Sequence, residues 1–122
     1  MSRKSDTTFN AHVAPYDRSA EQRAAEYDGI DPAQMYQPLL PLLPAKGGAV
    51  LDVGAGSGRD ARWLAAMGYS VVAIEPSAAF RAMIADKAQR DTARIDVRDG
   101  MLPELSSLAH DEKFDLILLG AV

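Results

Sequence analysis

A cluster of glycines in the middle of the chain is the feature of this sequence that best fits ligand chemistry. Residues 50–59 place glycines at positions 54, 56 and 58, directly after a strand-like apolar segment and directly before a helical one. Glycines allow a tight turn and a close approach of a ligand to the backbone, and the start of a helix offers unpaired N–H groups. Three glycines in five positions exceed what turning requires, so the sequence predicts a polar ligand here.

Two acidic residues flank this turn. Asp52 lies just before the first glycine, and Glu75 ends the next apolar segment, at about the twenty-residue spacing that places an acid on the ribose of a nucleotide cofactor. Such a carboxylate can accept hydrogen bonds from both ribose hydroxyls. Glu75 alone would fit an ordinary exposed charge equally well, but its spacing from the glycines favours the ribose role.

The position of the third glycine separates two classes of cofactor. A dinucleotide-binding turn has the form G-x-G-x-x-G, which would require a glycine where this chain has Arg59. The third glycine is instead Gly58. A bulky side chain at position 59 also does not help to make room for a pyrophosphate, so a nicotinamide cofactor is disfavoured.

The elements that would position these residues alternate between strand and helix from Ala49 onward. Strands are expected over residues 49–53, 70–75, 93–97 and 114–121, and helices over residues 59–67 and after the cap Ser77. This alternation is typical of parallel βαβ units. We therefore expect an α/β fold, a Rossmann-like three-layer sandwich around a mainly parallel sheet.

A different pattern precedes the sheet, and it divides the chain into residues 1–45 and 46–122. Residues 1–14 have no periodicity and are expected to form an arm. Ser19 and Gln22 fit a capping box for a short helix that ends near Asp28. Asp31 followed by Pro32 predicts a second helix start. We expect a helical lead-in over residues 1–45 and a cofactor-binding domain over residues 46–122.

Asp52 followed by G-x-G-x-G resembles the first motif of class I S-adenosylmethionine-dependent methyltransferases. The resemblance implies that Asp52, Gly54, Ala55 and Gly56 line the amino-acid end of S-adenosylmethionine, with Gly58 where this class of cofactor needs its third glycine. Glu75 would then bind the ribose.

Two later segments extend the resemblance. In this family the turn after the third strand often has an aspartate shortly before Leu-Pro, which implies that Asp99 accepts a hydrogen bond from the adenine amino group and that Met101 or Leu102 packs on the base. Asp96 is a weaker candidate for that role, and a loop aspartate that only turns the chain is the alternative. Residues 114–122 resemble the fourth-strand motif, which implies that Gly120 and the next residue pass under the methionine moiety.

The sequence as a whole resembles bacterial methyltransferases of the small-molecule type, whose sheet has the order 3-2-1-4 followed by three more strands. The chain ends after the fourth strand, so we expect a truncated domain whose methyl acceptor and catalytic residues are unknown. The fourth strand would be an apolar edge that favours homo-oligomers. A non-catalytic module that binds cofactor or another protein is the alternative function.

The composition favours one acidic domain that acts on a small molecule. Thirteen basic and seventeen acidic residues give a formal net charge of −4, which disfavours a nucleic-acid partner. The lack of cysteine favours a reducing cytoplasm. No apolar run approaches the ~20 residues of a membrane span, so no membrane association is expected. His12 and His110 are too few and too far apart to predict a metal site.

Overall fold

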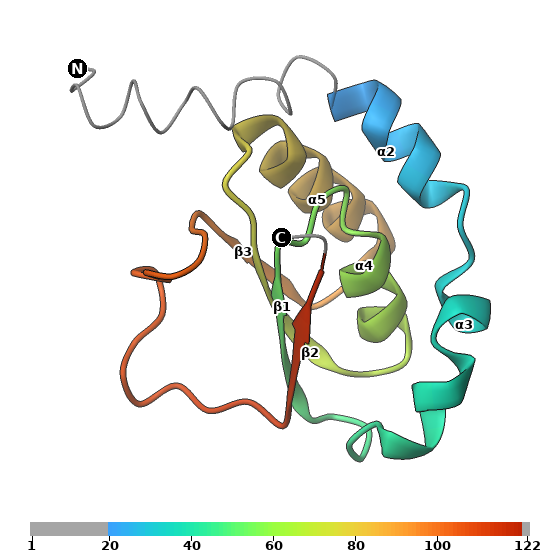
Figure 1. Cartoon of the computed structure of the whole chain (residues 1–122), viewed down its shortest axis with the longest axis vertical. Helices are drawn as coiled ribbons and strands as arrows, with labels where there is room; N and C mark the ends of the chain where they lie inside the picture. Colours follow the sequence, from blue (N-terminus) through green and yellow to red (C-terminus); the bar gives the residue numbers. More distant parts are fainter. Residues whose placement is uncertain (1–19, 121–122) are drawn as a thin grey trace.

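The computed structural model of the chain describes residues 20–120 (Figure 1). Four expected features lie outside this range: the N-terminal arm, His12, the helix cap at Ser19 and the last residue, 121, of the fourth strand. The elements in chain order are α2 (Ala20–Asp28), α3 (Pro32–Met35), the 3-10 helix η1 (Gln37–Leu42), β1 (Ala49–Val53), α4 (Arg59–Ala66), β2 (Ser70–Ile74), α5 (Ala78–Asp91), β3 (Ile95–Arg98) and β4 (Leu116–Leu119). None of the described helices is long and apolar enough to cross a membrane.

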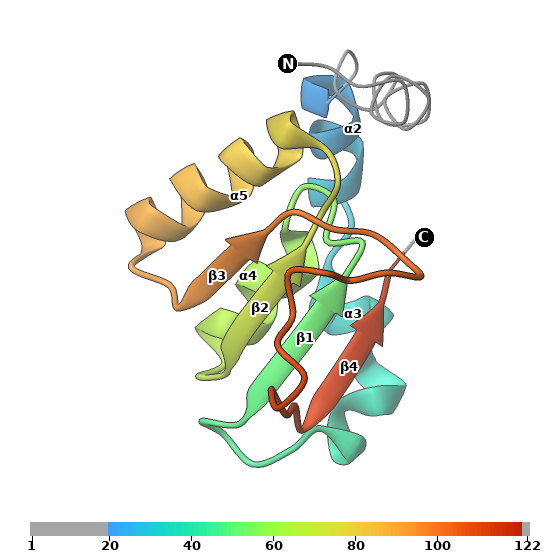
Figure 2. The ribbon, with the colours of Figure 1, turned by 90° about the vertical axis from the view of Figure 1, so that its left-hand side faces the viewer.

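The four strands form one parallel sheet in the order β3-β2-β1-β4, as expected. Asp52, the next-to-last residue of β1, is in register with Ala73 of β2 and with Leu118 of β4. The parallel arrangement brings the carboxyl ends of all strands to one edge of the sheet, as Figure 2 shows. The predicted site residues all follow or approach this edge.

The two faces of the sheet are covered differently. Helices α4 and α5 cover one face, where Val50, Ala61, Leu64, Val71 and Ala73 are buried. On the other face the long connection between β3 and β4 crosses the sheet (Figure 2). Its apolar side chains pack on Leu51, Val53 and Ile74. Within residues 20–120 the helical layer therefore lies on one side only, because the connection after β3 folds as turns.

The helical lead-in packs against the helices of the sheet domain. Ala20 and Ala24 of α2 are buried against Phe80 of α5. The expected helix start at Asp31 is confirmed, since its Oδ1 accepts a hydrogen bond from the backbone N–H of Ala33 at 3.0 Å.

Three strands are shorter than predicted. β2 ends at Ile74, one residue before the expected end at Glu75. β3 begins at Ile95 because Ala93 still closes α5, donating its N–H to the carbonyl of Ala88 at 2.9 Å. β4 begins at Leu116, because the residue before it, Asp115, is hydrogen-bonded to Ala49 at the start of β1 through both its backbone and its side chain. Its N–H donates to the carbonyl of Ala49, and its carboxylate accepts from the N–H of Ala49, both at 2.8 Å.

Candidate cofactor site

The glycine turn is hydrogen-bonded to the carboxyl end of the neighbouring strand, β2. The backbone N–H groups of Gly54 and Ala55 both donate to the carbonyl of Ile74, at 2.9 and 3.1 Å. Gly54, Gly56 and Gly58 all have positive φ values, of 75°, 59° and 86°. Side chains rarely tolerate this conformation, so the backbone of the turn accounts for glycine at each of the three positions.

The three glycines nevertheless face different surroundings. Gly54, Ala55 and Gly56 are half-buried, whereas Gly58 is buried. A Cβ added at Gly58 would lie 2.8 Å from Cγ1 of Ile84 on α5. Close packing between α4 and α5 is therefore a further reason for glycine at position 58, and the cofactor contact expected there stays a prediction.

Glu75 lies directly after β2, and its carboxylate is held against the turn. The Glu75 Oε1 atom accepts a hydrogen bond from the N–H of Gly56 at 2.8 Å, and Oε2 accepts from the N–H of Ser77 at 2.9 Å. The residue is 6% exposed. The structure thus brings Glu75 and the glycines together as the spacing predicted, and two backbone donors fix the orientation of the carboxylate.

Asp52 is a buried carboxylate beneath the turn. It is 1% exposed, and its Oδ2 atom has no hydrogen-bond partner among the described residues. Burial raises the pKa of Asp52 to about 7; the negative charges of Asp60 and Glu75 add to this rise, while the charge of Arg59 opposes it. An unpartnered buried carboxylate oxygen is costly, so a ligand that donates a hydrogen bond to it would be stabilised.

A second polar cluster at the start of α4 was not predicted. Asp60 accepts a hydrogen bond from the Tyr36 hydroxyl at 2.7 Å and from Arg59 Nε at 2.9 Å. The Tyr36 ring stacks on Trp63, with ring centroids 5.5 Å apart. Burial and the hydrogen bond to Asp60 raise the pKa of Tyr36 to about 12. The cluster connects the lead-in to the helix that follows the glycine turn.

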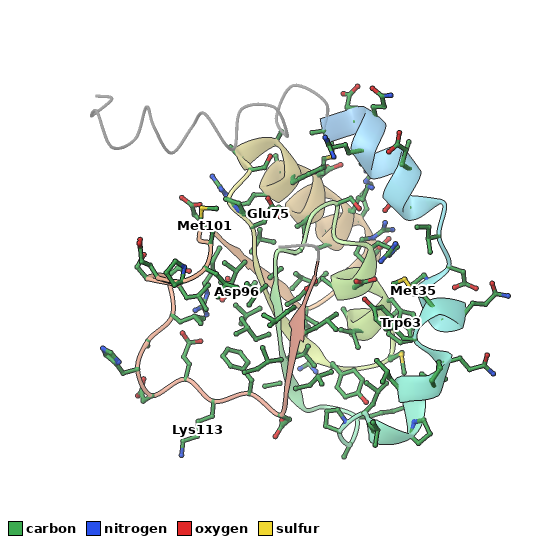
Figure 3. All side chains as sticks on the ribbon, in the orientation of Figure 1. Met35, Trp63, Glu75, Asp96, Met101 and Lys113 are labelled. Atoms are coloured by element: carbon green, nitrogen blue, oxygen red, sulfur yellow. The ribbon has the colours of Figure 1, made fainter. Side chains whose placement is uncertain are left out.

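Asp99 and Met101 lie near the same edge of the sheet, after β3. Asp99 is exposed, and its Oδ1 pairs with Arg81 Nη1 at 3.0 Å. The same nitrogen donates to the carbonyl of Glu75 at 2.9 Å, so Arg81 ties the loop to the end of β2. Met101 is half-buried and lies at the same end of the molecule as Glu75 (Figure 3). Nothing in the sequence indicated this role of Arg81, because an arginine on a helix is usually a surface charge.

Asp96, the weaker candidate for the adenine contact, lies in β3 itself. Its carboxylate pairs with Arg98 at 2.8 Å, and its side chain is 59% exposed. Asp96 therefore lies two residues before the carboxyl end of β3, whereas Asp99 follows that end directly.

Gly120 follows β4 and touches the turn. Its N–H donates to the carbonyl of Val53 at 2.9 Å. A Cβ added at Gly120 would lie 2.7 Å from the carbonyl oxygen of Gly54. Glycine at position 120 therefore lets the end of β4 pass close to the first residue of the turn, and its expected place under the methionine moiety stays a prediction.

The comparisons with known proteins agree with this geometry. Residues 50–122 match the family model of a methyltransferase domain. The chain belongs to this family, that of class I S-adenosylmethionine-dependent methyltransferases.

Individual relatives cover the chain only in part. A ubiquinone biosynthesis O-methyltransferase of Azorhizobium caulinodans is 34% identical over 77 residues, which are 63% of this chain and 30% of that enzyme. The chain therefore spans less than a third of the length of this curated relative.

Solved structures share the fold. A protein studied for the conversion of a disulfide bond into a thioacetal group during echinomycin biosynthesis has a TM-score of 0.62 and 29% identity, covering 72% of this chain and 36% of its own. The PH0226 protein of Pyrococcus horikoshii has a TM-score of 0.59 and 26% identity, and the match covers 70% of this chain and 39% of that protein. A coclaurine N-methyltransferase bound to N-methylheliamine and SAH, at 22% identity and a TM-score of 0.60 over 73% of this chain and 26% of its own, supports the fold alone.

Proposed function

We propose that this chain is the cofactor-binding part of a methyltransferase and that it binds S-adenosylmethionine, or the demethylated product S-adenosylhomocysteine, at the glycine turn. The observation that carries the proposal is the buried Asp52, whose Oδ2 lacks a partner among the described residues directly beneath half-buried glycines. The family implies a cofactor of this class, and the residues present fit it.

Opposite charges at the turn match the amino-acid end of that cofactor. Asp52 offers a carboxylate to an ammonium group. Arg59 lies close enough to Asp52 to lower its pKa, and its guanidinium suits a carboxylate through charge-assisted hydrogen bonds. Gly54, Ala55 and Gly56 would line this end, and the backbone there permits close approach.

The remaining site residues would hold the nucleoside. Glu75, fixed by its two backbone donors, would accept hydrogen bonds from the ribose hydroxyls. Asp99 would accept from the adenine amino group, with Met101 against the base. Gly120 would pass under the methionine moiety. The residues that would hold the nucleoside, Glu75 and Asp99, follow β2 and β3. The residues that would hold the amino-acid end include Asp52 in β1 and Gly120 after β4.

When bound, the cofactor supplies an electrophilic methyl group on a sulfonium, for in-line transfer to a nucleophile of the acceptor. The chain's own residues bind and orient that end and exclude water from it, which are the main contributions of a protein to such a transfer. We propose a small-molecule acceptor, since the net charge of −4 does not suit nucleic acid.

Calorimetric titration of the chain with S-adenosylhomocysteine, S-adenosylmethionine and NAD tests the proposal. We expect both adenosyl ligands to bind and NAD to bind more weakly, because Arg59 stands where a dinucleotide turn needs glycine. Tighter binding of NAD would contradict the assignment.

A second candidate function is a non-catalytic module that pairs with another chain. It is favoured by the exposed apolar side chains of β4, where Ile117 and Leu119 are each 58% exposed. A methyl-transfer assay distinguishes the two candidate functions. Turnover with S-adenosylmethionine by this chain, or by a longer one that contains it, supports the enzyme, whereas cofactor binding without turnover in both supports the module.

A further inference from the structure

One carboxylate joins three segments of the structure at the edge of the glycine turn. Asp28, the last residue of α2, accepts a hydrogen bond from the Ser57 hydroxyl through Oδ1 at 2.9 Å. Its other oxygen, Oδ2, accepts from Lys87 Nζ on α5 at 2.8 Å. The Asp28 side chain is 30% exposed and that of Lys87 is 23% exposed, so both side chains are partly covered, although Asp28 as a whole residue is exposed.

Ser57 lies within the turn, between Gly56 and Gly58, and is 1% exposed. The turn is thus held at two successive residues: Gly56 through its N–H to Glu75, and Ser57 through its hydroxyl to Asp28. Glycine backbones have wide conformational freedom. The orientation of the N–H groups in such a turn therefore depends strongly on hydrogen bonds from residues outside it.

We propose that Asp28 is a positioning residue of the cofactor site, which orders the glycine turn through Ser57 without touching the cofactor. The inference rests on the proposed function, since it assigns the lead-in helix a part in cofactor binding. A turn already held in its bound conformation loses less entropy when the ligand binds, so removal of the Asp28 carboxylate weakens binding through disorder of the turn.

The neighbouring ion pair between Arg62 of α4 and Asp91 of α5 provides a matched control. It has an N–O distance of 3.2 Å and side chains that are 32% and 48% exposed. Asp91 lies about one helical turn along α5 from Lys87. The ion pair connects helices of the same domain, and within residues 20–120 its two side chains are hydrogen-bonded to each other and not to the turn. The backbone N–H of Arg62 does donate to the carbonyl of Gly58 at 2.8 Å, but a substitution of the side chain keeps that hydrogen bond. We therefore expect the ion pair to stabilise the fold without ordering the glycines.

The first experiment compares Asp28→Ala, Ser57→Ala, the double variant and Arg62→Met. S-adenosylhomocysteine affinity is measured by calorimetry and unfolding by thermal melts. We expect Asp28→Ala and Ser57→Ala each to weaken affinity about tenfold, the double variant to lose no more than either, and Arg62→Met to bind as the wild type does. Additive losses in the double variant, or a lower melting temperature with unchanged affinity in Asp28→Ala, would overturn the inference.

Asp28→Asn provides a conservative variant that keeps an acceptor for Ser57 while removing the charge that pairs with Lys87. We expect it to retain most of the affinity and to rescue the loss seen with alanine. An affinity as low as that of Asp28→Ala would mean that the Lys87 ion pair, and not the link to Ser57, is what matters.

Hydrogen exchange without ligand separates this inference from the proposed function. The amides of residues 56–58 should exchange faster in Asp28→Ala than in the wild type and be unchanged in Arg62→Met. If they do so while the wild type fails to bind S-adenosylhomocysteine, the proposed function is wrong and the ordering role stands. Unchanged exchange at these amides contradicts the ordering role whatever the ligand.

Discussion

Gly56 donates its backbone N–H to the carboxylate of Glu75 at 2.8 Å, although nineteen residues separate them. This hydrogen bond joins the turn after β1 to the residue that follows β2. It makes the predicted ribose acceptor part of the scaffold that holds the turn. Changes at Glu75 therefore act on two parts of the proposed site at once.

Glu75→Ala should weaken binding of S-adenosylhomocysteine by about 1.5–3 kcal/mol, because a charged acceptor is lost from the ribose and from Gly56. Glu75→Gln should lose less, since its amide oxygen can still accept from one backbone N–H. Calorimetric titration measures both. Asp86→Ala serves as the control, because Asp86 forms only an exposed pair with Arg90 on the same helix, and its affinity should match the wild type. Equal affinity for wild type and Glu75→Ala would contradict the ribose role and leave Glu75 as a buried carboxylate that only holds the turn.

Asp52→Asn should change how stability depends on pH. The folded pKa of Asp52 is raised to about 7, above the ordinary value of 3.8, so between these values the folded state binds more protons than the unfolded state. The contribution of Asp52 to stability is therefore most favourable below the unfolded pKa and is lost as pH rises through about 7. The asparagine variant should gain stability relative to the wild type from pH 5 to pH 8, as measured by urea unfolding. A constant difference over this range would mean that Asp52 titrates normally.

Gly56 and Gly58 should respond differently to substitution. Gly56→Val places a branched side chain on the half-buried side of the turn and should abolish binding of S-adenosylhomocysteine while leaving much of the fold. Gly58→Ala brings a Cβ to 2.8 Å from Ile84 and should destabilise the fold by about 1–3 kcal/mol through overpacking. Circular dichroism melts and titration on the same samples separate the two effects. If both variants unfold alike, backbone geometry is the main requirement at both positions.

The sequence predicted the sheet and its edge well, because those features depend on local patterns. The limits of β1 at Ala49 and Val53 follow from periodicity, and the cap at Ser77 follows from a short motif. The start of β3 was predicted two residues early, since an apolar alanine gives no sign that it closes the preceding helix. The roles of the predicted site residues toward a ligand stay predictions.

The contacts of the lead-in were not predictable in the same way. Tyr36 meets Asp60 across 24 residues, and Asp28 meets Ser57 across 29. No periodic pattern connects these residues, because each contact depends on how the lead-in helices pack against α4 and α5. An acid at the end of a short helix is indistinguishable in sequence from a surface charge, so the Asp28 link became visible only in three dimensions.

The outer strand of the described sheet, β4, presents an unpaired edge. β4 pairs with β1 on one side and with no other strand among residues 20–120, and it exposes Ile117 and Leu119 on one face. Unpaired backbone groups beside apolar side chains favour pairing with another chain. We therefore expect the 122-residue chain to self-associate through β4, with an increase in mass by light scattering as concentration rises.

Ile117→Lys should shift this chain toward the monomer, because a charge on an exposed edge strand opposes strand pairing. Leu42→Lys is the matched control: Leu42 is 76% exposed on η1, outside the sheet, and its substitution should leave association unchanged. Association that both variants reduce equally would point to general apolar contact and not to the strand edge. A wild-type chain that stays monomeric at all concentrations would contradict the prediction, because the apolar face of β4 would then be stable in water without a partner.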